Sequence, residues 1–130
     1  MRRINALTVY FLFTDKLHEL REHDDDLYNI DIWINPRYGG RGLCMDYAYI
    51  QEYQRVIRKY PNHFFTPEET KAIVDEYVGF YPELEKYAGE FSDYVSSGLE
   101  EKVARIQESH LYRSKLHLQH YMYEGFRGYD

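Results

Sequence analysis

The chain has one cysteine among its 130 residues, so it cannot form a disulfide within itself. A chain of this length buries about two-thirds of the surface that its unfolded form exposes, which is enough for one core without covalent cross-links. Cys44 is therefore expected to be a buried thiol, or one kept reduced as in the cytosol. These features predict a single compact domain over residues 1–130.

Long apolar runs are lacking as well. No stretch approaches the roughly 18 consecutive apolar residues that a membrane-spanning helix needs. The apolar run at residues 7–13 is short, and no small-residue cleavage site separates it from the charged residues 15–21, so no signal peptide is expected. We therefore expect a cytoplasmic protein without a membrane partner. We also expect a loose C-terminus at residues 125–130, since chain ends are often poorly ordered.

Motifs specific for catalysis are also missing. Cys44 with His63, or the tandem Ser96 and Ser97 with a distant histidine, are the candidates for a nucleophile and its base. Neither candidate lies in a sequence context that nucleophilic enzymes share. The sequence thus predicts a protein that is not an enzyme and has no cofactor, and no motif indicates a known family.

Tyrosine, by contrast, is abundant, with 15 copies beside a single tryptophan. A tyrosine ring can be half buried and still offer its hydroxyl to a partner, so tyrosine is enriched at protein interfaces. The other interpretation is that tyrosines fill a small core where leucine would serve. The sequence leaves both open.

Negative charge is concentrated in one stretch of a chain whose net charge is −6. Residues 64–101 carry ten acidic side chains and two lysines, whereas residues 33–63 and 102–130 are both net positive. Carboxylates spaced along rigid helices can attract a protein that binds DNA or RNA through a basic groove. The alternative is a solvated surface that only keeps the protein soluble. The residues predicted to bind a partner are Glu68, Glu69, Asp75, Glu76, Glu83, Glu90, Asp93, Tyr87 and Tyr94.

Hydrophobic periodicity predicts helices over most of the chain. Residues 4–22 have apolar side chains at three- and four-residue steps, although residues 7–13 could instead form a strand. Further predicted helices cover residues 49–60, 66–78, 82–95 and 99–106, with Gly79 placed to close the second of these. The start at Thr66 is the clearest, because Thr66 and Glu69 have the spacing of a capping box. Ser97 and Glu100 have the same spacing.

One segment alternates with a period of two. Apolar side chains at positions 28, 30, 32 and 34 predict a strand over residues 28–34. A lone strand leaves its backbone groups unpaired, so it needs a partner strand. The candidates are residues 43–47, the C-terminal segment, or a second copy of the chain in a homodimer. Within the C-terminal segment, residues 115–123 also alternate with a period of two. The predicted fold is α+β, mainly helical with about five helices and a small sheet around residues 28–34.

Histidines give one alternative function. If residues 99–124 form one helix, a single polar face carries His110, Arg113, His117, His120 and Glu124. His117 and His120 would then be candidates to bind a divalent metal, as in a small metal-dependent enzyme or metal-binding protein. Their spacing lacks the glutamate of a metalloprotease pair, and no second ligand cluster is evident, so we expect no bound metal.

The glycine-rich residues 35–42 give another alternative. Arg37, Tyr38 and Arg41 are candidates to bind phosphate or to stack on single-stranded nucleic acid. The lysine and the serine or threonine of a phosphate-binding loop are absent, so direct binding of nucleic acid is the less favoured hypothesis.

The favoured prediction is a non-catalytic protein-binding module. Its acidic surface with tyrosines would dock on a basic protein partner, such as a nucleic-acid-binding enzyme that it inhibits by nucleic-acid mimicry. Small inhibitors of this kind are common in phages and mobile elements, which is an argument by analogy alone.

Overall fold

The computed structural model describes residues 2–38, 50–56, 58, 60 and 63–116, and their regular structure is helical throughout. In chain order these elements are α1 (Ala6–Arg21), the 3-10 helix η1 (Asp25–Leu27), α2 (Tyr28–Ile34), η2 (Pro36–Tyr38), helical residues 50–56, α4 (Pro67–Gly79), η3 (Pro82–Tyr87), α5 (Ala88–Ser96), α6 (Leu99–Glu108) and α7 (His110–Leu116). Within these ranges the only β-type pairing is an isolated bridge between Ile4 and Phe65. The predicted α+β class is therefore wrong, and the fold is all-α.

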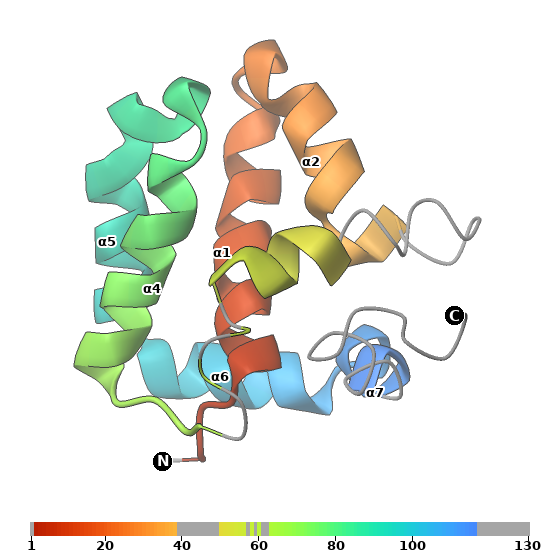
Figure 1. Ribbon diagram of the computed structural model, residues 1–130, viewed down its shortest axis with the longest axis vertical. Coiled ribbons are helices and arrows are strands. Elements are labelled where there is room, and N and C mark those ends of the chain that lie inside the picture. The colour runs from red at the N-terminus through yellow and green to blue at the C-terminus, as the bar shows by residue number, and fades with distance from the viewer. Residues whose placement is uncertain (1, 39–49, 57, 59, 61–62, 117–130) are drawn as a thin grey trace.

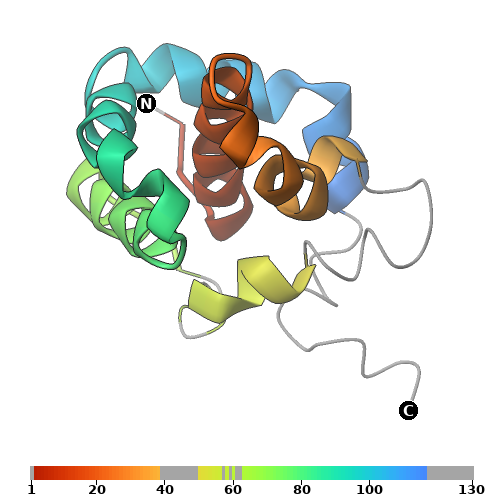
Figure 2. The ribbon, with the colours of Figure 1, turned by 90° about the horizontal axis from the view of Figure 1, so that it is seen from above.

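Helix α1 lies at the centre of the molecule. Helices α4 and α5 flank it on one side and α2 on the other, α6 crosses it, and residues 50–56 lie across its remaining face (Figures 1 and 2). Every residue from Ala6 to Thr14 is buried, so this part of the helix is covered all round. That explains why residues 7–13 also resembled a strand: a helix covered on all sides loses its polar face, and with it the helical period.

Residues 28–34 form α2 and not the predicted strand. The side chains that face the core are Leu27, Asp31 and Ile34, which are spaced four and three residues apart, as one helical face requires. Because the middle position of this stripe is an aspartate, the apolar pattern of the helix is broken in the sequence. Tyr28, one of the four positions that suggested the alternation, is exposed although it is aromatic, and so is Trp33.

The capping box at the start of α4 is confirmed. The amide of Glu69 donates to Thr66 Oγ1 at 3.1 Å, and the amide of Thr66 donates to Glu69 Oε1 at 2.9 Å. The similar spacing of Ser97 and Glu100 forms no such box, because α6 begins after Gly98, whose left-handed φ of 61° makes it the N-cap without a side-chain hydrogen bond. The serine, in extended conformation, ends α5 instead.

The helix that starts at Leu99 does not continue to residue 124. It stops at Ser109, which is extended at φ −72° and ψ 146°, and the Ser109 hydroxyl accepts the amide of Tyr112 in the new helix α7. The described end of the chain, up to Leu116, is helical. Several predictions fall outside the described residues: those for Arg41, Cys44, His117, His120 and Glu124, for residues 43–47 and 117–123, and for the loose terminus at 125–130.

Tyrosine does fill part of the core. Among the described tyrosines, Tyr10, Tyr53, Tyr77 and Tyr112 are buried. The Tyr10 hydroxyl donates to the carbonyl of Ile34, and the Tyr77 hydroxyl donates to the carbonyl of Tyr53 at 2.9 Å. The Tyr77 ring also stacks on Phe13, with centroids 5.0 Å apart. These tyrosines therefore join helices through both their rings and their hydroxyls.

None of the helices described is long and apolar enough to cross a bilayer.

Candidate partner-binding surface

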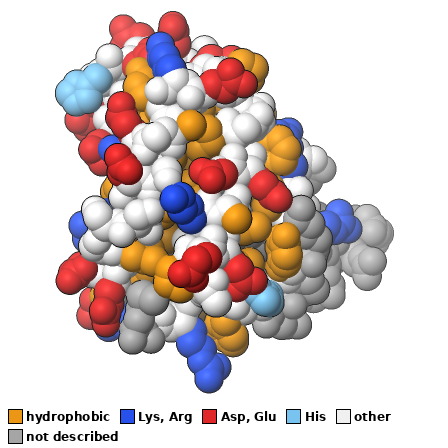
Figure 3. Space-filling model, turned by 90° about the vertical axis from the view of Figure 1, so that its left-hand side faces the viewer, with side chains coloured by type: hydrophobic (Ala, Val, Ile, Leu, Met, Phe, Trp, Pro, Cys, Tyr) orange, Lys and Arg blue, Asp and Glu red, His pale blue; other side chains and the backbone are white. Residues whose placement is uncertain are grey.

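The acidic stretch of the sequence folds into one helical layer. Helices α4 and α5 pack against each other and both contact α1, with η3 joining them (Figure 1). Their apolar side chains, such as Tyr77 and Phe91, are buried. The predicted binding residues are distributed as follows: Glu68, Glu69, Asp75 and Glu76 on α4, Glu83 and Tyr87 on η3, and Glu90, Asp93 and Tyr94 on α5. All seven acids are exposed. On this side of the molecule, acidic side chains are spread over the surface with apolar ones between them (Figure 3).

Most of these carboxylates have no partner within the described part of the chain. Glu68, Asp75, Glu83, Glu90 and Asp93 form no hydrogen bond or ion pair there. Glu69 differs, because it is part of the capping box and also contacts His63 Nε2 at 3.1 Å. The hydrogen bond from the Thr66 amide, followed by that from His63, lowers the pKa of Glu69. A carboxylate without an internal partner keeps its charge available for a binding partner.

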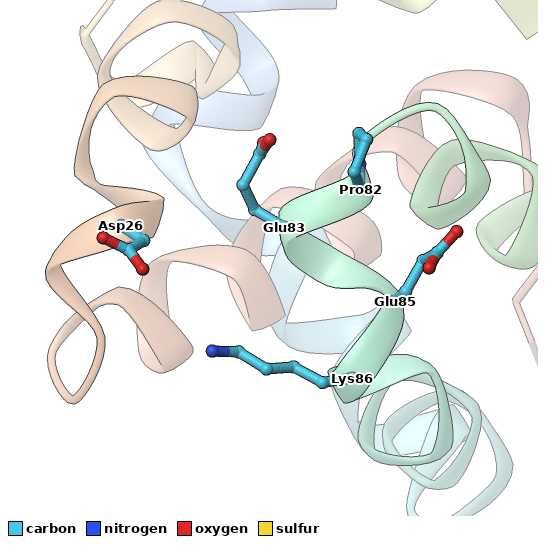
Figure 4. Close-up of a pocket in the computed structure, with 5 residues that line it drawn as sticks. All are labelled: Asp26, Pro82, Glu83, Glu85 and Lys86. Carbon is cyan, nitrogen blue, oxygen red and sulfur yellow. The ribbon is translucent and has the colours of Figure 1, made fainter.

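A hollow of about 280 Å³ lies between η1 and η3 and includes Glu83 of this acidic region (Figure 4). It is lined by Asp26, Pro82, Glu83, Glu85 and Lys86. Lys86 extends from η3 toward the side on which Asp26 lies, while Glu85 points away from it (Figure 4). The charge pattern of the sequence did not indicate Asp26, because Asp26 lies outside residues 64–101, where the negative charge is concentrated. We define the acidic surface as Asp26, Glu68, Asp75, Glu83, Glu85, Glu90 and Asp93.

The positive charge of Lys86, the lysine in this hollow, is offset by a carboxylate of the same chain. Lys86 Nζ lies 3.1 Å from Asp24 Oδ2, and the Tyr87 hydroxyl donates to the same oxygen. The hydrogen bond from Tyr87, and then that from Lys86, lowers the pKa of Asp24, while the same carboxylate raises the pKa of Tyr87. Asp24 thus offsets the charge of Lys86, and the Tyr87 hydroxyl is engaged inside the chain.

Tyr94 faces cationic neighbours instead of the acidic surface. Its ring lies 4.5 Å from Lys102 Nζ and 5.6 Å from Lys16 Nζ, and its hydroxyl is 3.5 Å from Arg105 Nη2. Burial, followed by the nearby Asp15 carboxylate, raises the pKa of Tyr94 to about 12. The two tyrosines predicted for the interface are therefore partly buried side chains with internal contacts.

The loop candidates are also engaged within the chain. Arg37 Nη2 lies 3.7 Å from Asp15 Oδ1, and the Tyr38 hydroxyl accepts a hydrogen bond from Arg21 at 3.1 Å. Of the catalytic candidates, His63 contacts Glu69, and the Ser96 hydroxyl donates to the carbonyl of Ser92. In the part of the chain that the structure describes, no group of three or more His, Cys, Asp or Glu side chains is arranged to hold a metal ion.

Comparison of the chain with models of known protein families, with curated proteins and with solved structures found no match. The chemistry of the surface therefore carries the functional argument alone. Unpartnered charge of one sign on rigid helices is suited to electrostatic docking, which gives specificity and a fast association rate.

Proposed function

We propose that this protein is a non-catalytic binding module whose acidic surface docks on the basic surface of a protein partner. The observation that supports this most directly is that Glu68, Asp75, Glu83, Glu90 and Asp93, on α4, η3 and α5, have no partner among the residues that the structure describes. Two lysines lie in the same stretch, and one of them, Lys86, is held by Asp24. A partner cation would therefore meet little competition from within this stretch.

The spacing of the carboxylates supports a partner that normally binds nucleic acid. Glu68 and Asp75 lie seven residues apart on α4, which is two helical turns or about 10 Å along its axis. Three nucleotide steps of one DNA strand cover about the same length. Rigid helices would hold such charges at fixed positions, as a phosphate backbone does. The partner would then be a protein whose basic groove binds either nucleic acid or this module, and this module would inhibit it.

A capture experiment with two charge-reversed variants tests the proposal. The wild-type chain, Asp75→Lys with Asp93→Lys, and Glu19→Lys with Glu108→Lys are immobilised and exposed to lysate of the native host. Both variants change the net charge equally, but the second places its reversals on α1 and α6, outside the acidic surface. Retained proteins are identified by mass spectrometry, and the leading partner is purified.

The expected result is a basic partner that binds the wild type and the Glu19/Glu108 control but not the Asp75/Asp93 variant. Raised salt should weaken binding, because screening acts over about 8 Å at physiological ionic strength. Duplex DNA or RNA should compete with the wild-type chain for the partner. Equal binding by the Asp75/Asp93 variant would refute docking through the acidic surface, and binding without competition by nucleic acid would refute mimicry alone.

A further inference from the structure

A second hollow lies between the start of α4 and the junction of α5 with α6. Its volume is about 410 Å³, within the range of about 300–1,000 Å³ that is usual for small-molecule sites. Three segments that are separate in the sequence build it, and the residues that line it are Pro67, Glu68, Lys71, Val95, Ser96 and Leu99.

One side of this hollow is apolar. Val95, near the end of α5, is buried, and Leu99, at the start of α6, is partly buried against the same core. The hydroxyl of Ser96 between them already donates to the carbonyl of Ser92 at 2.8 Å. This side can therefore cover an aliphatic group and remove it from water, which is favourable in proportion to the apolar area covered.

The other side of the hollow carries two opposite charges. Glu68 and Lys71 are three residues apart on α4, a spacing at which such side chains often pair. They form no ion pair with each other, and neither has another partner among the described residues. No other charged side chain of the described chain lines this hollow. It thus offers one free anion and one free cation beside an apolar surface.

We propose that this hollow binds a free α-amino acid with an aliphatic side chain. The ammonium group pairs with Glu68, the carboxylate pairs with Lys71, and the side chain covers Val95 and Leu99. An amino acid carries both charges at one end and its apolar group at the other, and the hollow is divided in the same way between α4 and the α5–α6 junction.

Ligands with one kind of charge fit the hollow less well. An alkyl amine pairs with Glu68 but is repelled by Lys71, whereas a fatty acid or a phosphate pairs with Lys71 and is repelled by Glu68. The zwitterion is the form that satisfies both. This site does not depend on docking of a protein partner, although Glu68 also belongs to the acidic surface.

Nuclear magnetic resonance on the full chain at neutral pH and low salt tests the site with four probes. L-leucine is compared with L-leucinamide, which lacks the carboxylate, with N-acetyl-L-leucine, which lacks the ammonium group, and with glycine, which lacks the side chain. L-leucine should shift the backbone amides of Lys71, Val95 and Leu99 and should saturate in the millimolar range. Each of the two singly charged probes should bind about two- to fivefold more weakly, the size expected for losing one exposed ion pair.

Two variants assign the charges. Lys71→Gln should weaken L-leucine but not L-leucinamide, which has no carboxylate to lose. Glu68→Gln should weaken L-leucine but not N-acetyl-L-leucine. The matched control is Asp75→Asn, which removes an exposed and unpartnered acid of α4 outside the hollow and should leave all four affinities unchanged.

The proposal fails if L-leucine shifts none of the three amides. It fails equally if L-leucinamide and N-acetyl-L-leucine both bind as tightly as L-leucine, or if glycine does, because the hollow would then not recognise a zwitterion with an apolar side chain. Affinity for L-leucine that is unchanged in both Glu68→Gln and Lys71→Gln would also overturn it. The four probes on the wild-type chain decide the matter even if a variant fails to fold.

Discussion

The carboxylates on the two sides of α1 behave in opposite ways. On the α4–α5 side, those of the acidic surface are exposed and have no ion-pair partner in the described chain. On the α2 side, Asp31 and Asp15 are desolvated and each contacts cationic side chains. We propose that the first group provides charge for a partner, whereas the second group organises the fold. Counting charges along the sequence detects the first group only.

The largest effect on stability is expected at Asp31, the buried carboxylate between α1 and α2. Replacing Asp31 by alanine should lower the free energy of unfolding by about 3 kcal/mol, because His18, Arg21 and Asn35 lose the carboxylate that all three contact. Denaturation by urea at pH 7 measures the loss. The matched control is Asp93→Ala on the acidic surface, which should change stability by less than about 0.5 kcal/mol. A loss below about 1 kcal/mol for Asp31→Ala would mean that the buried network does not hold α2.

Replacing Asp15 should raise the free energy of unfolding, whereas replacing Asp31 lowers it. Its pKa is about 6 in the folded chain, above the ordinary value of 3.8, so the folded state binds this proton more tightly than the unfolded state does. The resulting stability is complete below about pH 4 and is lost as the pH rises through 6. Asp15→Asn has no charge to bury, so at pH 8 it should be more stable than the wild type by about 2 kcal/mol.

The difference between the Asp15→Asn variant and the wild type should shrink toward zero near pH 4, as measured by urea denaturation at several pH values. Asp24 and Glu69 oppose this trend in both proteins, since their pKa values are lowered, and they cancel in the comparison. A variant that is less stable than the wild type at pH 8 would show that the ion pair with Arg37 outweighs desolvation.

Thr66 and Ser97 have the same spacing to a following glutamate in the sequence, but only Thr66 caps a helix with its side chain. Thr66→Ala should cost about 1 kcal/mol, because the capping box loses the hydroxyl that accepts the Glu69 amide. Ser97→Ala should cost almost nothing, since no side chain caps α6. Thermal unfolding of the two variants measures both effects, and equal losses would remove the distinction that the structure draws between them.

These cases show what the sequence could predict. Local signals were sufficient where one residue pair decides the structure, as at Thr66 and Glu69. They failed where a distant contact decides it: Asp31 belongs to the buried stripe of α2 only because His18 and Arg21 supply its partners from α1. The acids of α4 and α5 were predicted to bind a partner from the count of charges along the sequence, and that role stays a prediction. Asp26 was missed because its proximity to η3 arises from packing, between segments more than fifty residues apart.

The smallest effect on stability should come from the residues proposed for binding. Asp75→Lys with Asp93→Lys removes two exposed acids that have no partner among the described residues, and lysine favours helices more than aspartate does. Relief of repulsion within a chain of net charge −6 acts in the same direction. The free energy of unfolding should therefore change by no more than about 0.5 kcal/mol, with any shift toward higher stability. If urea denaturation instead shows a loss above about 1 kcal/mol, these carboxylates support the fold, and a loss of partner binding in the same variant would no longer identify them as a docking surface.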